Sequence, residues 1–136
     1  MTPEELKKYF VDYQLATQTF NKDTIEGSLK KYFTNDSLIK FCHPFGTFNG
    51  LENLLSKCLV QLIDSIPDLE RRDMIVMAGK TPEGEFWMGT MGNYMGTFVK
   101  PFLDIPPSGN LVHIRYHEFF QIEDNKITEM QSIWDL

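Results

Sequence analysis

One carboxylate interrupts an otherwise apolar stripe in the segment Gly109–Asp124, whose sequence is GNLVHIRYHEFFQIED. The residues of this segment alternate as they do in a strand with one face in a core. Side chains two apart share a face, so Glu118 should point the same way as Tyr116 and Phe120. An ionised carboxylate buried there is costly, and it must find hydrogen-bonding partners or become neutral. A carboxylate in such surroundings suits general acid or base catalysis, so Glu118 is a candidate catalytic residue.

A structural role for Glu118 stays open, because a buried glutamate can simply tie two strands together, and a bulge could turn the side chain outward. The chemistry would also need a donor facing a developing oxyanion. His43, at the end of an earlier strand, is the second candidate catalytic residue, and Asn93 and Tyr94 are further donors. The remaining histidines, at positions 113 and 117, fall on the face opposite Glu118, which predicts a surface or subunit interface for them.

Length and charge limit the class of protein. The 136 residues suit one domain spanning residues 1–136, alone or as part of a longer protein. The 13 basic and 19 acidic residues give a net charge of −6, which argues against a nucleic-acid partner. No apolar run reaches the length of a membrane span. Cys42 and Cys58 lack CxxC spacing, which predicts reduced thiols and a cytoplasmic location.

The histidines do not form a metal-binding pattern. His113 and His117 are the only pair with regular spacing, and in a strand they would lie ~13 Å apart, too far to share a zinc ion. The sequence also lacks a glycine-rich phosphate loop and a nucleophile elbow. We therefore expect neither a metal nor an organic cofactor.

The rest of the chain supplies the elements that position Glu118. Apolar spacing predicts helices first, then a strand, a helix and four consecutive antiparallel strands, which is an α+β arrangement. Helices on one side of a curved antiparallel sheet would enclose a pocket on its concave face, and the glycines of the long strand would bend it. The predicted helices are Pro3–Phe20, Asn21–Phe33 and Gly50–Ile66, the predicted strands are Ser37–His43, Leu69–Lys80, Glu85–Phe98, Gly109–Asp124 and Lys126–Asp135, and Phe48–Gly50 is a predicted turn.

Large apolar and amphipathic side chains on three of these strands are candidates to line the pocket and hold a small hydrophobic ligand, although core packing would explain them equally well. They are Trp87, Met91, Asn93, Tyr94, Tyr116, Phe120 and Trp134.

Several segments in order along the chain resemble the SnoaL-like polyketide cyclases, within the nuclear-transport-factor-2-like or ketosteroid-isomerase-like superfamily. They are residues 50–52, 66–69, 91–98, 105–109 and 118–127. The resemblance implies a cone-shaped α+β fold of the cystatin-like barrel type. It also implies intramolecular aldol cyclisation, with an aspartate of this strand as the general acid or base.

Glu118 falls at the position of that aspartate, but its additional methylene moves the oxygens by ~1.5 Å. A displacement of that size can cost ~100-fold in rate. The chain departs from the family pattern again where Asn125 replaces a turn glycine, and where Gln131 replaces a tryptophan that here comes three residues later, as Trp134.

Three functional hypotheses follow, and the residues leave open whether the chain is an enzyme. The first is cofactor-free aldol cyclisation or isomerisation of a small hydrophobic carbonyl compound. The second is a non-catalytic ligand-binding or assembly module on the same fold. The third is a hydrolase or dehydratase that uses Glu118 and a histidine. An exposed sheet face predicts a homodimer in each case.

Overall fold

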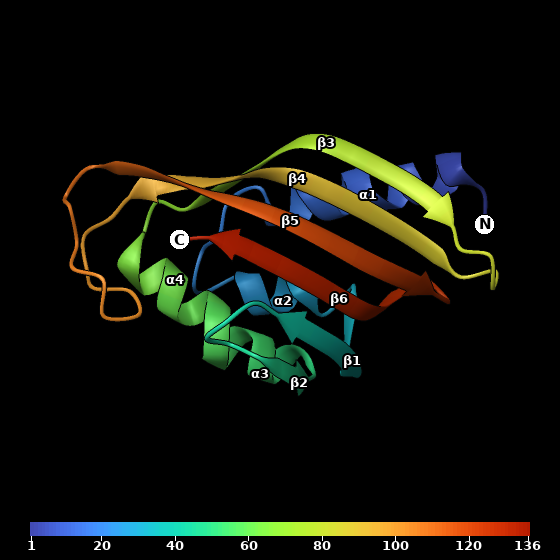
Figure 1. Cartoon of the computed structure of the whole chain (residues 1–136), viewed down its shortest axis with the longest axis horizontal. Coiled ribbons are helices and arrows are strands. Elements are labelled where there is room, and N and C mark those ends of the chain that lie inside the picture. The colour runs from blue at the N-terminus through green and yellow to red at the C-terminus, as the bar shows by residue number, and fades with distance from the viewer.

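A six-stranded sheet, curved but not closed into a barrel, forms one layer of the molecule, and the helices lie against one face of it (Figure 1). The computed structural model describes all residues from 1 to 136. We call the face toward the helices the inner face and the opposite one the outer face. The α+β class predicted from the sequence is confirmed.

The first helix begins with strong capping signals. Thr2 accepts a hydrogen bond from the Glu5 backbone and the Glu5 side chain accepts one from the Thr2 backbone, with Pro3 in the first turn. The second helix spans only five residues, and the predicted helix from Asn21 to Phe33 was therefore too long. Phe33 already belongs to the sheet, where it pairs with Ile127. No helix has the length and hydrophobicity that crossing a bilayer requires. The helical segments are α1 (Pro3–Thr17), α2 (Ile25–Leu29), α3 (Leu51–Leu54), the π-helical turn η1 (Leu55–Leu59) and α4 (Val60–Ser65).

The strands run in the spatial order β2-β1-β6-β5-β4-β3. The last four form the predicted antiparallel meander, whereas β1 pairs with β6 in parallel, which local periodicity does not reveal. The short strand β2 lies where the sequence suggested only a turn. The strands are β1 (Phe33–Phe41), β2 (Thr47–Asn49), β3 (Glu70–Lys80), β4 (Phe86–Thr97), β5 (Leu111–Glu123) and β6 (Lys126–Asp135).

The predicted alternation along β5 is confirmed. Tyr116, Glu118 and Phe120 are buried on the inner face, while His113 and His117 are exposed on the outer face. Glu118 therefore lies in the middle of the core and not in solvent.

A bulge in β3 changes which side chains face inward. The pairing of β3 with β4 shifts between Asp73 and Ile75, so Met74 is the extra residue. Asp73 lies opposite Gly92, and a Cβ atom at Gly92 would overlap the Arg72 carbonyl oxygen and lie 2.6 Å from the Tyr116 hydroxyl. The absence of a side chain at Gly92 thus lets the bulged strand approach β4 closely.

We expect the substitution Gly92→Ala to lower the free energy of unfolding by about 1 to 3 kcal/mol, because the methyl group must displace the backbone of β3. Gly79→Ala is the matched control on the same strand pair, since a Cβ atom there meets nothing within 4 Å. Urea unfolding followed by circular dichroism measures both. Equal stability of the two variants would show that the close approach at Gly92 does not constrain the fold.

Candidate active site

Glu118 is completely buried, and both of its carboxylate oxygens are hydrogen-bonded. Arg71 Nη1 donates to Oε1 at 2.5 Å, and the Ser132 hydroxyl donates to Oε2 at 2.6 Å. Arg71 comes from β3, and Ser132 is the direct partner of Glu118 on β6. Three strands therefore fix the position of this carboxylate.

Arg71 links Glu118 to a second carboxylate. Its side chain is 1% exposed, and it donates from Nε and Nη2 to the two oxygens of Asp73, at 3.2 and 3.0 Å. Its guanidinium carbon lies 4.4 Å from the centre of the Tyr116 ring. Such a cation is stable in a core only when it is paired and hydrogen-bonded, and here two carboxylates and an aromatic face supply that pairing.

Asp73 is saturated with donors. Besides the two bonds from Arg71, its Oδ1 accepts from the Tyr116 hydroxyl at 2.6 Å and from the Thr90 hydroxyl at 2.7 Å. Burial alone would raise the pKa of Asp73, but Arg71 and these hydroxyl groups outweigh it and lower that pKa below its ordinary value. Ionised Asp73 therefore stabilises the folded state. This contribution is fully present above pH about 4, near the pKa of an unfolded aspartate, and is lost as the pH falls through the lower pKa of the folded state.

Arg71 keeps its charge under all ordinary conditions. Burial by itself would lower the pKa of the guanidinium, but the charges of Glu118 and Asp73 raise it well above the usual value. The site therefore contains a permanent cation in direct contact with the Glu118 carboxylate.

Tyr94 adds a neutral donor. Burial, followed by the charge of Glu118, raises the pKa of Tyr94 well above its ordinary value, so the phenol stays protonated. Its oxygen accepts a hydrogen bond from Arg71 Nη1 at 3.3 Å, and no hydrogen bond in the structure uses its proton. This O–H group is free to donate to an oxygen that enters the site.

The structure divides the predicted lining residues between the two faces of the sheet. Tyr94, Tyr116, Phe120 and Trp134 are buried on the inner face together with Glu118. The odd-numbered β4 residues Trp87, Met91 and Asn93 lie on the outer face, because the buried positions of β4 around Tyr94 are even-numbered.

The three histidines lie apart from Glu118. His43 is exposed in the turn after β1, and His113 and His117 are exposed on the outer face. None of them hydrogen-bonds to Glu118, whose partners are Arg71 and Ser132. Nowhere do three or more His, Cys, Asp or Glu side chains come together as a metal site.

Four residues of the network were not singled out from the sequence: Arg71, Asp73, Thr90 and Ser132. The run Glu70–Asp73 consists entirely of charged residues, so no alternation marks which of them face inward. The usable signal was Glu118 itself, because a carboxylate on an apolar face requires a buried cation or donor nearby.

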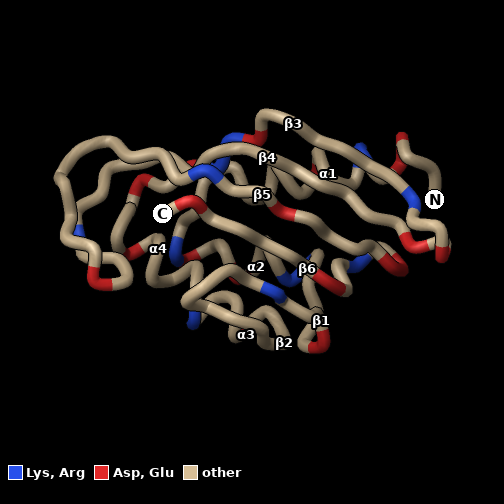
Figure 2. Tube along the Cα trace, viewed as in Figure 1, with Lys and Arg blue, Asp and Glu red and all other residues tan.

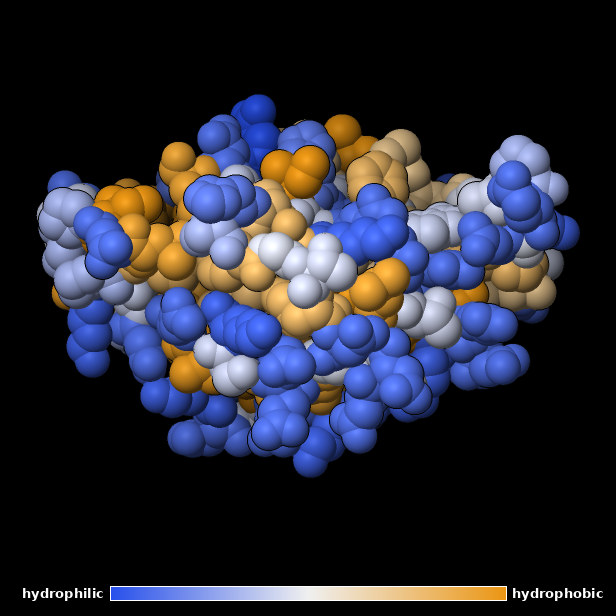
Figure 3. Space-filling model, turned by 60° about the horizontal axis from the view of Figure 1, so that its bottom comes forward, coloured by the Kyte–Doolittle hydropathy of each residue, from blue (hydrophilic) through white to orange (hydrophobic).

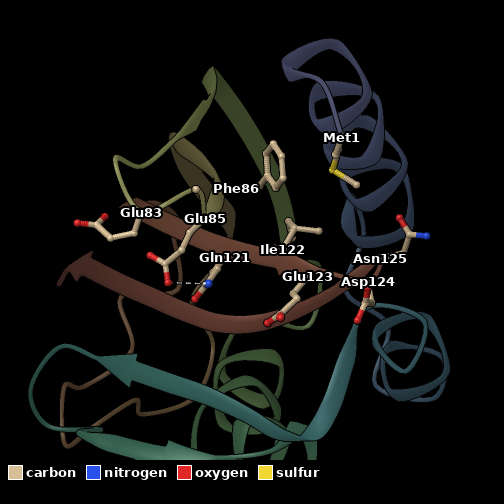
Figure 4. A pocket seen from close by; sticks show the side chains of 10 residues that line it. Met1, Glu83, Glu85, Phe86, Gln121, Ile122, Glu123, Asp124 and Asn125 are labelled. Atoms are coloured by element: carbon tan, nitrogen blue, oxygen red, sulfur yellow. Dashed lines mark hydrogen bonds between the residues drawn. The ribbon is translucent and has the colours of Figure 1, made fainter.

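The space beside Glu118 is filled by side chains. Five pockets on the molecule are lined by residues other than Glu118 and Arg71. One pocket of about 550 Å³ lies at the β4 and β5 ends near the N-terminus, where four acidic side chains gather and Gln121 donates to Glu85 at 3.0 Å (Figure 4). It contains no member of the Glu118 network, so a ligand that reaches Glu118 must displace side chains of the core.

We expect Arg71→Met to lower the free energy of unfolding by about 3 to 5 kcal/mol, because it leaves two carboxylates buried without their cation. Arg72→Met is the matched control, since the Arg72 side chain is 62% exposed, and a change within about 0.5 kcal/mol is expected. Urea unfolding measures both, and the double variant Arg71→Met with Glu118→Gln should recover part of the loss. An unchanged free energy of unfolding in Arg71→Met would contradict the central role of this cation.

Comparison with known proteins gives one family and one fold. The family model of the SnoaL-like polyketide cyclases matches residues 12–136. No protein of curated function matches the sequence.

Among solved structures, the chain resembles AclR from Streptomyces galilaeus, with 16% identity, a TM-score of 0.76 and coverage of 98% of this chain and 91% of that one. A SnoaL-like protein from Jannaschia sp. CCS1 has 22% identity, a TM-score of 0.73 and coverage of 98% and 87%. IdmH from Streptomyces antibioticus has 15% identity, a TM-score of 0.75 and coverage of 95% and 91%. At these identities the likeness concerns the fold.

Proposed function

We propose a function for this chain, which belongs to the SnoaL-like polyketide cyclase family. It binds a small hydrophobic carbonyl compound on the inner face of its sheet and acts on it by cofactor-free acid–base chemistry. The observation that carries the proposal is the position of Glu118, a fully buried carboxylate in one network with a permanent cation and a protonated phenol. Aldol cyclisation and isomerisation both require such a combination of base and oxyanion donors.

In the proposed reaction, Glu118 removes a proton from the carbon next to a carbonyl group. The resulting enolate oxygen accepts hydrogen bonds from Arg71 Nη1 and from the Tyr94 hydroxyl. The enolate carbon then attacks a second carbonyl of the same molecule, and the new alkoxide takes up the proton from Glu118. In an isomerisation the proton returns to a different carbon instead, so no other reactant is needed.

Arg71 couples ligand binding to the release of the carboxylate in this scheme. Without ligand, its Nη1 donates to Glu118 Oε1 at 2.5 Å, which holds the carboxylate in place. When a ligand oxygen takes over that donor, Oε1 is released from Arg71 and can accept the proton of the ligand. Arg71 and Tyr94 have the donor role in this proposal, since the His43 imidazole is exposed.

A non-catalytic ligand-binding or assembly module is the second candidate, and one observation favours it. Both Glu118 oxygens already have partners and the residue is completely buried, as expected for a carboxylate that only stabilises the core. A histidine-dependent hydrolase receives no such support, because His113 and His117 are exposed on the other face of the sheet.

Deuterium exchange separates the first two candidates. We expect the protein to accelerate exchange of the acidic C1 protons of 2-tetralone, a hydrophobic bicyclic ketone, in D2O followed by proton NMR. Glu118→Gln should lower this acceleration by ~100-fold or more, since general bases contribute 10²- to 10⁴-fold. Glu123→Gln, an exposed carboxylate on the same strand, is the control and should leave it unchanged. Binding without any acceleration, equal in wild type and Glu118→Gln, would support the non-catalytic module.

The outer face of the sheet supports a proposal about the partner. It exposes large apolar side chains from the three strands β3, β5 and β6, visible as orange among blue across the upper part of Figure 3. Figure 2 shows that charged residues are sparse along the middle of these strands. Exposed apolar surface of this kind usually marks an interaction site. The residues are Ile75, Met77, Leu111, Phe119 and Ile133.

A second copy of the chain is the occupant that fits this face. Arg115 and Asp135 are direct neighbours across β5 and β6 on it. A two-fold related copy can therefore set the arginine of each protomer against the aspartate of the other while the apolar side chains pack together. We propose a homodimer formed through the outer face.

We expect a dimer in sedimentation velocity for the wild type and a monomer for Ile133→Asp, because the substitution buries a charge at the contact. Leu15→Asp is the matched control, since Leu15 is similarly exposed but lies on α1, away from the outer face. A monomeric wild type, or a dimer that Ile133→Asp leaves intact, would contradict the proposal.

Both cysteines are free thiols that suit a reducing compartment, and we propose a cytoplasmic location on this basis. Burial, with a smaller effect of Cys42, raises the pKa of the Cys58 thiol to about 12. Cys58 therefore stays protonated and unreactive and acts as part of the core.

A further inference from the structure

An apolar pocket opens at the end of the molecule where α4 ends, the 98–110 loop turns and β5 begins, on the left in Figure 1. Its volume is about 190 Å³, and seven of its nine lining residues are hydrophobic, among them Ile66, Phe98, Phe102 and Ile114. A cavity of about 150 Å³ is large enough for benzene. The pocket can therefore hold one six-membered ring, and a larger molecule must extend further into the core.

The indole of Trp134 lacks the hydrogen bond that its burial calls for. Trp134 is 4% exposed, and its Nε1 is the only buried side-chain nitrogen or oxygen in the chain without a partner. Leaving a buried donor unsatisfied costs about 1 to 3 kcal/mol. Buried tryptophans usually find an acceptor, so this group calls for an explanation.

A continuous row of aromatic rings connects the pocket to Trp134. Phe102 lines the pocket, and its ring centre lies 6.3 Å from that of Phe45. The Phe45 ring in turn lies 5.4 Å from Trp134. The ring of Phe45 thus separates Trp134 from the pocket-lining Phe102, and a ligand that reaches Trp134 from the pocket must displace Phe45.

The same row continues from Trp134 to the candidate active site. The ring centres of Trp134 and Tyr94 are 5.4 Å apart, and the Tyr94 hydroxyl accepts from Arg71, which holds Glu118. Within this row of rings, two groups carry a proton that no hydrogen bond uses, the Trp134 N–H and the Tyr94 O–H. Both groups are donors, and they belong to neighbouring rings.

We propose that the apolar pocket is the entrance and outer part of the ligand site, and that Trp134 Nε1–H donates to a ligand oxygen there. This inference rests on the proposed function and specifies its substrate class. Two donors on adjacent rings select a hydrophobic ring compound with two carbonyl oxygens about one ring apart. One oxygen would bind at Trp134, and the other would reach Tyr94 and Arg71 beside the base. An intramolecular aldol reaction needs two carbonyl groups in the same molecule, in agreement with this arrangement.

The indole N–H signals of the two tryptophans make the inference directly testable. In ¹H–¹⁵N NMR spectra of labelled protein, Trp87→Phe identifies the signal of Trp134, and Trp87 on the outer face is the internal control. The probes are 2-tetralone and tetralin, which have the same ring skeleton with and without the oxygen. We expect 2-tetralone to move the Trp134 signal downfield in a saturable manner, tetralin to produce no such downfield shift, and the Trp87 signal to stay in place.

Variants test the pocket and the donor separately. Trp134→Phe should weaken binding of 2-tetralone by about 3- to 10-fold, the usual contribution of one hydrogen bond, and leave the affinity for tetralin nearly unchanged. Val112→Phe, which fills the pocket from its half-buried position on β5, should abolish binding of both probes. Folding of each variant is checked from the dispersion of its backbone amide signals.

The outcomes distinguish this inference from the proposed function. If 2-tetralone binds or exchanges deuterium while the Trp134 signal stays fixed and Val112→Phe has no effect, the pocket assignment is wrong and the function at Glu118 stands. If the Trp134 signal moves but Glu118→Gln changes no exchange rate, the pocket stands and the catalytic proposal fails. If neither probe binds wild-type protein, the inference is overturned.

Discussion

The guanidinium of Arg71, held between two buried carboxylates, is the interaction on which the interior of this protein depends. Two acidic side chains on the inner face of a sheet would be strongly unfavourable without a cation, and a lone arginine there would be equally unfavourable. Arg71 contacts Glu118 and Asp73 at once and lies over the ring of Tyr116, so each charge has a partner. The network joins β3, β4, β5 and β6, and its loss would affect sheet geometry as well as chemistry.

That contact exists only because of a backbone irregularity elsewhere in the sheet. Arg71 and Asp73 face inward before the bulge at Met74, and the alternation reverses after it. Gly92 allows the two strands to approach at that point, and Thr90 and Tyr116 then reach Asp73 from β4 and β5. The polar centre thus follows from one extra residue in β3 and one missing side chain in β4. The other buried polar side chains of the core carry no charge.

These features explain how far the sequence could be interpreted. The even-odd alternation around Glu118 predicted its burial correctly, because β5 is regular and has one buried face. Arg71 was missed because its run of charged neighbours has no periodicity and the bulge shifts the register. Trp87 was expected among the pocket residues but lies on the outer face, which is itself apolar, so hydrophobicity did not distinguish the two faces of β4. The parallel pairing of β1 with β6 joins residues about 90 positions apart, beyond the reach of any local pattern.

In the proposed function, the apolar end of the inner face supplies affinity for the ligand and its polar centre supplies the reactive groups. The end near Ile66 and Phe102 offers apolar surface, and burial of a hydrocarbon ring there contributes roughly 25 cal/mol per Å². The centre near Glu118 holds charges whose partners are already in place, so a ligand that takes a hydrogen bond from Arg71 replaces one that Glu118 already accepts and gains little affinity. Binding energy from the apolar end must therefore offset the opening of the Arg71–Glu118 pair. A compound without enough apolar surface would leave that pair closed, and for this reason the ring system of the ligand, more than its carbonyl groups, should decide which molecules reach Glu118.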